Sequence, residues 1–153
     1  MAEQKKSGSA TRSVREVMTP NPKTVTGTDT VVQAARIMRD QNAGVVPVVE
    51  GKKVVGLVTD RDIVVRAIAD GKDANKTHVK DVMSKDIRTV KEETLVSQAL
   101  DLMSKSDIRR LPVVNQNDEL VGIISIGDLA AKTNQDDKIG KAVENISQAA
   151  PNN

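Results

Sequence analysis

Two short segments of this chain carry a hydroxyl residue followed three positions later by an aspartate. They are GLVTDRDI at 56–63, with Thr59 and Asp62, and GIISIGDL at 122–129, with Ser125 and Asp128. An ionised carboxylate only accepts hydrogen bonds, so it can take two of them from vicinal hydroxyls such as a ribose 2′,3′-diol. A helix N-terminus beside it would offer free N–H groups to a phosphate. The same spacing also resembles a capping box that begins a helix, so the sequence leaves ligand binding and helix capping both open.

The composition argues against several other kinds of chemistry. The 153 residues include no Cys, Phe, Tyr or Trp and a single His, His78. The sequence therefore offers no thiolate nucleophile, no disulfide and no histidine-based metal cluster or triad. The formal net charge of +2 and the missing aromatic residues do not favour nucleic acid as a partner. Without an apolar run of membrane-spanning length or an apolar signal region, we expect a cytoplasmic protein. Because no general base, nucleophile or metal set converges in the sequence, we also expect it not to be an enzyme.

The chain contains an internal repeat. Met83 follows Met18 by 65 positions, whereas Gly122 follows Gly56 by 66, so one residue is inserted between the two strands of a predicted hairpin. We predict repeats at 13–71 and 78–133 with a linker at 72–77. A disordered tail is predicted at 1–12, and the C-terminal tail at 134–153 has the apolar spacing of a short helix.

Each repeat has the pattern β-α-β-β-α, which predicts an α/β (α+β) fold. The first repeat has predicted strands at 24–25, 45–49 and 54–58, a helix capped by Asp29 and ended near Gly44, and a final helix at 63–69. The second has strands at 89–90, 111–114 and 120–124, a helix capped by Thr94, and a final helix at 129–132. A unit of about 60 residues is marginal alone, so we expect the copies to pack face to face with pseudo-two-fold symmetry.

Four repeated motifs give the chain a family resemblance. Val-Met-Ser/Thr, Ala-x-x-x-Met, Leu/Val-Pro-Val-Val and Gly-[IL]-[VI]-[ST]-x-x-Asp-[IL] recur in this order over residues 14–132. Together they resemble a pair of CBS domains of the stand-alone bacterial type. The resemblance implies a regulatory module without catalysis that holds AMP, ADP or ATP between its repeats, with magnesium arriving only as a nucleotide complex. It also implies a homodimer and a protein partner that the sequence does not identify.

The resemblance also assigns residues to the nucleotide. Asp62 and Asp128 would bind ribose, supported by Thr59 and Ser125, and the apolar side chains of Leu57 and Ile123 would contact the base. In the family each aspartate works with the opening strand of the other repeat. One predicted site therefore combines Thr59 and Asp62 with Arg88 and Thr89, and the other combines Ser125 and Asp128 with Lys23 and Thr24.

Basic residues before the second strand meet the phosphates in family members. Arg109 and Arg110 hold that place in the second repeat, whereas Gly44 and Val45 hold it in the first, so the two sites must differ in charge. We expect the arginine-lined site to be the one opposite Asp62. Arg109 and Arg110 can also be interpreted as solvated cations near a helix C-terminus, and we favour a phosphate contact for at least one of them. Arg61 could reach a phosphate, in the first repeat only.

Two alternatives to nucleotide sensing remain open. The chain could be a dimerisation and interaction scaffold in which both hydroxyl-x-x-aspartate motifs are only helix caps. It could also bind another adenosine ligand, such as S-adenosylmethionine, NAD or a dinucleoside polyphosphate, because a contact to the ribose diol does not distinguish these compounds.

Overall fold

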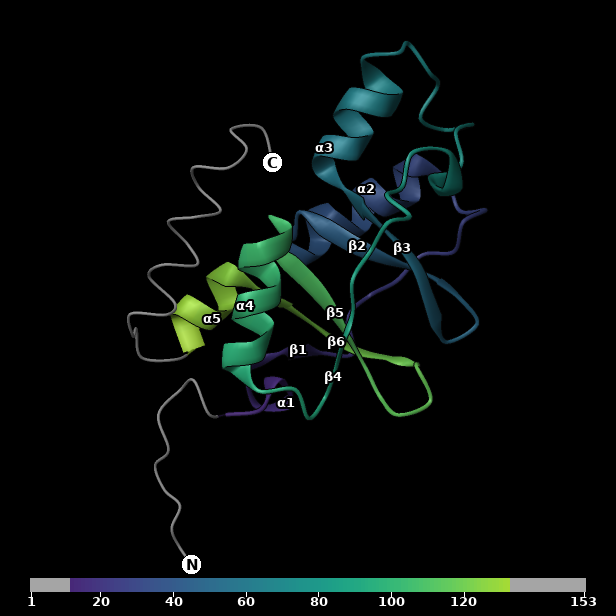
Figure 1. Ribbon diagram of the computed structural model, residues 1–153. Helices are drawn as coiled ribbons and strands as arrows, with labels where there is room; N and C mark the ends of the chain where they lie inside the picture. The colour runs from purple at the N-terminus through teal and green to yellow at the C-terminus, as the bar shows by residue number, and fades with distance from the viewer. Residues whose placement is uncertain (1–11, 133–153) are drawn as a thin grey trace, which may run out of the picture. The chain divides into compact units, whose positions relative to one another are not determined.

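The computed structural model describes residues 12–132, which form two compact units (Figure 1). Within the described residues, unit 1 contains 12–20, 88–117 and 121–132, and unit 2 contains 21–87 and 118–120. The C-terminal tail predicted at 134–153 and all but the last residue of the predicted N-terminal tail lie outside the described residues.

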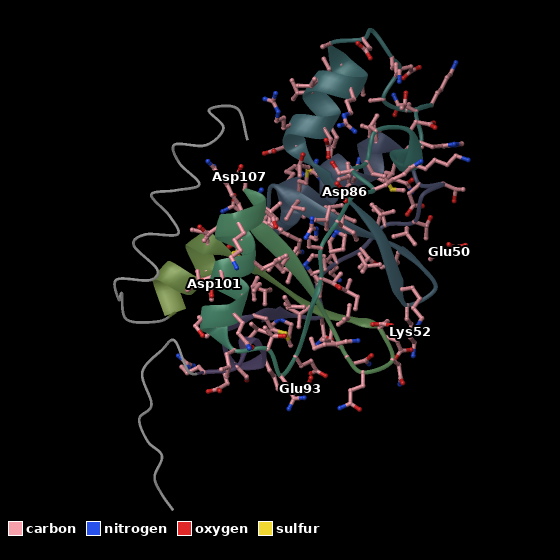
Figure 2. The ribbon with its side chains drawn as sticks, viewed as in Figure 1. Glu50, Lys52, Asp86, Glu93, Asp101 and Asp107 are labelled. Atoms are coloured by element: carbon pink, nitrogen blue, oxygen red, sulfur yellow. The ribbon has the colours of Figure 1, made fainter. Side chains whose placement is uncertain are left out.

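Unit 2 is built on an antiparallel hairpin of β2 (Val45–Glu50) and β3 (Lys53–Thr59). The hairpin turns at Gly51, which has a φ of 65°, and Figure 2 labels Glu50 and Lys52 on either side of this turn. Helix α2 (Val31–Gln41) buries Val31, Ala34 and Met38 in a core shared with the hairpin. The chain leaves β3 through α3 (Asp60–Ile63), a π-helical turn η3 (Val64–Ile68) and a 3₁₀ turn η4 (Val79–Asp81).

Unit 1 contains a four-stranded sheet in the order β1-β6-β5-β4. The strands are β1 (Thr19–Pro20), β6 (Leu120–Ser125), β5 (Arg110–Val114) and β4 (Val90–Lys91), and the helices are α1 (Val14–Val17), α4 (Val96–Ser106) and α5 (Ile126–Lys132). An aliphatic core forms where the apolar stripe of α4 meets the sheet, centred on Leu100, Met103, Leu111 and Ile124, all fully buried. The predicted α+β fold is confirmed.

The compact units do not coincide with the sequence repeats, because each repeat's opening segment packs in the other unit. In unit 1, the N–H of Val14 donates to the carbonyl of Thr94 at 2.8 Å, and Arg15 pairs with Glu92 at 3.0 Å. In unit 2, Ser84 and Leu57 exchange two backbone hydrogen bonds of 2.8 and 3.0 Å. Each unit therefore takes residues from both repeats.

A glycine in each second hairpin strand makes room for the methionine of an opening segment. A Cβ at Gly56 would lie 2.8 Å from the carbonyl oxygen of Ser84 and 2.9 Å from Sδ of Met83. At Gly122 the three atoms nearest to a Cβ all belong to the side chain of Met18. Real Cβ atoms do not approach so closely, so the repeated Gly and Met belong to one packing contact.

Replacing Gly56 with alanine is expected to destabilise the protein by about 1–3 kcal/mol, because the Ser84 backbone must shift to admit the methyl group. Urea unfolding would measure the change in the free energy of unfolding. Gly127→Ala is the matched control: its Cβ would make one ordinary contact, with Oγ of Ser125 at 3.8 Å, and alanine is favoured over glycine in a helix by up to about 1 kcal/mol. Equal effects of the two substitutions would contradict this account of Gly56.

The ends of α2 and the start of α4 differ from the predicted ones by one or two residues, whereas α3 and α5 begin at Asp60 and Ile126, three residues before the predicted final helices. The N-cap of α2 is Thr30, whose side chain accepts from the N–H of Gln33 at 3.3 Å. Asp29 is one residue too early, and its carboxylate accepts from the N–H of Thr26 at 2.8 Å instead. Likewise, α4 is capped at Leu95, one residue after Thr94.

The C-terminal ends of α2 and α4 are left-handed residues other than glycine. Asn42 ends α2 with a φ of 51°, so the prediction that Gly44 ends this helix was wrong. Asp107, labelled at the end of α4 in Figure 2, is its counterpart with a φ of 55°. Asn and Asp tolerate this conformation better than other non-glycine residues.

Candidate functional site

In unit 2, the residues of the first motif share one face of β3 and the turn that follows it. Gly56 and Val58 point into the core, so Leu57 and Thr59 lie on the opposite, half-buried face. Asp62 is the third residue of α3, and its N–H donates to the Thr59 hydroxyl at 3.0 Å. The N–H of Thr59 donates in return to Oδ2 of Asp62, also at 3.0 Å. The capping box is closed, which confirms the helix-cap interpretation for Thr59 and Asp62.

In unit 1, the second motif forms only half of this capping box. Ile123 and Ser125 share the half-buried face of β6, and the N–H of Asp128 donates to the Ser125 hydroxyl at 3.0 Å. Across residues 12–132, no hydrogen bond reaches the Asp128 carboxylate. The Asp128 carboxylate is half-buried, whereas Asp62 is 8% exposed. Both oxygens of Asp128 can therefore accept bonds from a ligand.

The residue beside each motif is an arginine in unit 1 and a glycine in unit 2. The N–H of Ile126 donates to the carbonyl of Arg109 at 3.0 Å, and the N–H of Asp60 donates to the carbonyl of Gly44, also at 3.0 Å. Arg109 and Gly44 are thus equivalent positions, as the repeat predicts. Nε of Arg109 is buried, and among the described residues it has no hydrogen-bond partner. An unsatisfied buried donor costs about 1–3 kcal/mol, so this nitrogen is suited to an acceptor that the described residues do not supply.

Arg109 thus lies next to the Ser125–Asp128 motif within unit 1. Arg110 is the first residue of β5 and is half-buried in the same unit. We predicted from the sequence that these arginines line the nucleotide site of Asp62. Asp62 belongs to the other unit, so this remains a prediction.

The remaining predicted ligands divide between the units. Lys23 and Thr24 belong to unit 2, as Asp62 does, and Arg88 and Thr89 belong to unit 1, as Asp128 does. Lys23, Arg88 and Thr89 are exposed and Thr24 is half-buried. Each crossed site that the resemblance implies would join residues of both units, and this pairing also stays a prediction. Arg61 is exposed on α3, where its backbone N–H donates to the Asp60 carboxylate at 2.8 Å.

Sequence reasoning missed Arg66, which lies on η3 one turn after Asp62. Its Nε is 3.9 Å from Oδ1 of Asp62. Acidic and basic residues four apart on a helix are neighbours, so the spacing of Asp62 and Arg66 was a usable signal. The two motif aspartates therefore differ in the surroundings of their side chains: the Asp62 carboxylate contacts Thr59 and Arg66, whereas the Asp128 carboxylate accepts no hydrogen bond from a described residue.

Among residues 12–132, no group of three or more His, Asp or Glu side chains could hold a metal ion. No helix in this range is long and apolar enough to span a membrane.

Known proteins resemble the chain over most of its length. The model of the CBS domain matches residues 14–68 and again 79–133. The CBS domain-containing protein YhcV of Bacillus subtilis is 41% identical over 135 residues, which cover 88% of this chain and 95% of YhcV.

Two solved structures with bound adenosine compounds have the same fold. CBSX2 in complex with AMP has a TM-score of 0.67 and 25% identity, covering 78% of this chain and 94% of CBSX2. The CBS domain pair of protein MJ0100, in complex with 5′-methylthioadenosine and S-adenosyl-L-methionine, has a TM-score of 0.70 and 28% identity, covering 79% of this chain and 94% of that pair. The chain belongs to the CBS domain family and carries two CBS domains in tandem.

Proposed function

We propose that the chain is a cytoplasmic, non-catalytic regulatory module that binds an adenine nucleotide at the Ser125–Asp128 motif. The observation that carries this proposal is the pairing, in unit 1, of an Asp128 carboxylate that accepts no bond from a described residue with a buried Arg109 Nε that donates none to one. The first is an acceptor for two ribose hydroxyls, and the second is a donor for a phosphate oxygen. A nucleotide supplies both groups in one molecule.

The nucleotide site that contains an arginine is thus proposed at Asp128, whereas the sequence led us to expect it opposite Asp62. Arg109 lies beside Ile126 at the start of α5, directly after Ser125, whereas the equivalent position beside Asp62 is Gly44. We therefore propose AMP, ADP or ATP as the ligand at Asp128, with Ile123 against the base. Where ATP binds, magnesium would arrive with its phosphates. The complexes of CBSX2 with AMP and of MJ0100 with two adenosine compounds support adenosine as the shared chemistry.

The proposed mechanism is regulatory rather than chemical. A ligand that binds one arrangement of the chain more tightly than another shifts the population toward that arrangement. A partner protein or a second copy of the chain would then respond to the shift, with a coupling free energy that is typically about 1–3 kcal/mol.

A scaffold function is the second candidate, and an exposed apolar stripe on η3 favours it. Val64, Val65 and Ile68 are 57%, 44% and 56% exposed. Burial of such side chains would stabilise a homodimer by about 25 cal/mol per Å² of apolar surface removed from water, before the cost of association. The two functions are compatible, because a dimer can report a ligand.

Thermal unfolding with AMP, ADP, ATP, adenosine and S-adenosylmethionine tests the proposed function. A ligand at 100 times its Kd stabilises the folded state by about 2.7 kcal/mol, so adenine nucleotides are expected to raise the Tm clearly. GMP is the control for base recognition, and light scattering on the same samples gives the oligomeric state. No stabilisation by any adenosine compound at millimolar concentration would leave only the scaffold function.

A further inference from the structure

Arg66 connects two parts of unit 2 that are distant in sequence. Its Nη1 donates to the carbonyls of Val82 at 3.3 Å and Met83 at 3.4 Å. Its Nε lies 3.9 Å from Oδ1 of Asp62, and the side chain is 53% exposed. One guanidinium group therefore spans from the motif aspartate to the backbone of the segment that opens the second repeat.

The same segment is also attached to the strand before the motif. Ser84 exchanges two backbone hydrogen bonds with Leu57, and Met83 lies against Gly56. Thr59 lies two residues after Leu57 on β3, and its N–H donates to Oδ2 of Asp62. The contacts form a closed ring, called the clasp below, that runs from Asp62 through Arg66 to residues 82–84, and back through Leu57 and Thr59.

In the clasp the two oxygens of the Asp62 carboxylate are approached from different directions. Thr59 donates to Oδ2, and the Arg66 guanidinium faces Oδ1. One hydrogen bond and one ion pair restrict the orientation of the Asp62 carboxylate and leave it further lone pairs, so a ligand that donates to them loses less free energy to ordering. Because Arg66 is itself held by two carbonyls, the orientation of Asp62 depends on the position of residues 82–84.

We propose that Arg66 is a positioning residue that couples ligand binding at Asp62 to the order of residues 82–84. Residues of unit 2 alone form every contact of the clasp. Its ligand-dependent part rests on the proposed adenine-nucleotide function and extends this function from Asp128 to a second site at Asp62. Coupling between two sites is reciprocal. A ribose bound to Asp62 therefore stabilises the Arg66 contacts and slows the opening of residues 82–84, and loss of these contacts weakens ribose binding.

The second repeat does not duplicate the clasp in sequence. Lys132 follows Asp128 by four residues, as Arg66 follows Asp62. A lysine has one compact ammonium group, whereas the planar guanidinium presents donors in several directions. We therefore propose this coupling for the Asp62 site.

Amide hydrogen exchange measured by NMR tests the clasp in the protein without ligand. In Arg66→Gln, the amides of Ser84 and Leu57 are expected to exchange roughly twofold to fivefold faster, which is the effect expected for a half-exposed ion pair. Arg36→Gln, at an exposed arginine on α2 of the same unit, is the matched control and should leave these rates unchanged. Unchanged rates in Arg66→Gln, or equal acceleration in both variants, would overturn the proposal.

The ligand-dependent part is tested in an Asp128→Asn background, where Asp62 is the remaining motif aspartate. Saturating AMP is expected to slow exchange at Ser84 when Arg66 is present and to have no effect on it in the Arg66→Gln variant. Calorimetry should show an AMP affinity lower by roughly twofold to fivefold in Arg66→Gln. Arg66→Lys keeps the positive charge and loses the planar guanidinium with its several donors. Compared with Arg66→Gln, it should recover part of the AMP affinity and none of the coupling to Ser84.

The possible failures can be told apart. If the unaltered chain binds no adenine compound, the proposed function fails, and the exchange rates without ligand still decide whether Arg66 forms the clasp. If AMP binds and slows exchange at Ser84 equally with and without the Arg66→Gln substitution, Arg66 is not the coupling residue, although the proposed function stands.

Discussion

Asp128→Asn is expected to weaken AMP, ADP and ATP binding by roughly tenfold or more. Hydrogen bonds to a charged group contribute about 1.5–3 kcal/mol, and each 1.4 kcal/mol is about a factor of ten in affinity. Asparagine keeps one acceptor oxygen and replaces the other with a donor, so it cannot accept from both ribose hydroxyls. Isothermal titration calorimetry with each nucleotide measures the change.

The folded state should tolerate this substitution better than the matched one at Asp62. No hydrogen bond from a described residue reaches the Asp128 carboxylate, whereas the Asp62 carboxylate accepts from Thr59 and faces Arg66. Asp62→Asn should therefore lower the free energy of unfolding by about 1 kcal/mol, more than Asp128→Asn does. Urea unfolding of both variants provides the comparison.

A ligand without the 2′-hydroxyl separates a ribose contact from a general effect on the site. 2′-Deoxy-AMP should bind the unaltered chain less tightly than AMP, and Asp128→Asn should reduce this difference, as a double-mutant cycle between ligand and protein. If Asp128→Asn lowered stability and left every affinity unchanged, the Ser125–Asp128 motif would be a helix cap only.

Arg109→Gln is expected to lower the affinity for nucleotides by about tenfold while leaving the affinity for adenosine unchanged. Its buried Nε makes no hydrogen bond within residues 12–132, so a phosphate oxygen would satisfy it. Calorimetry with AMP and with adenosine, which differ only in the phosphate, measures the two affinities separately.

The stability of this variant gives a second readout. Removal of an unsatisfied buried donor should leave the free energy of unfolding unchanged or raise it. Lys105→Gln, at an exposed cation of α4 in the same unit, controls for the loss of one positive charge. Equal loss of AMP affinity in both variants would point to long-range electrostatics, and equal loss of AMP and adenosine affinity in Arg109→Gln would exclude a phosphate contact.

The helices and long strands were predictable because the sequence pattern of each one occurs in both repeats. Hydrophobic spacing placed α2, α4 and the four long strands, and the shift in the repeat offset placed the hairpin turn. By contrast, β1 has two residues, too few to show a period, and its pairing with β6 is distant in sequence. The exchange of opening segments between the units was missed for the same reason, since sequence spacing does not report long-range pairing.

The candidate site was predicted in its residues and only partly in its arrangement. The repeated spacing predicted that Thr59 contacts Asp62 and that Ser125 contacts Asp128. In the structure the N–H of each aspartate donates to the hydroxyl of its partner. The sequence could not show that, among the described residues, only one of these two capping boxes is closed, because this depends on side-chain orientation. The hydrogen bonds from Arg66 to the carbonyls of Val82 and Met83 could not be predicted either, because these residues are 16 and 17 positions away in the sequence.

A crystal structure of the chain grown with AMP, ADP and ATP tests the central claim most directly. We predict a bound nucleotide whose ribose hydroxyls donate to Asp128 at about 2.5–3.0 Å and whose phosphate oxygen accepts from Nε of Arg109. A nucleotide bound with its ribose away from Asp128, or crystals without nucleotide at millimolar concentrations, would contradict this prediction.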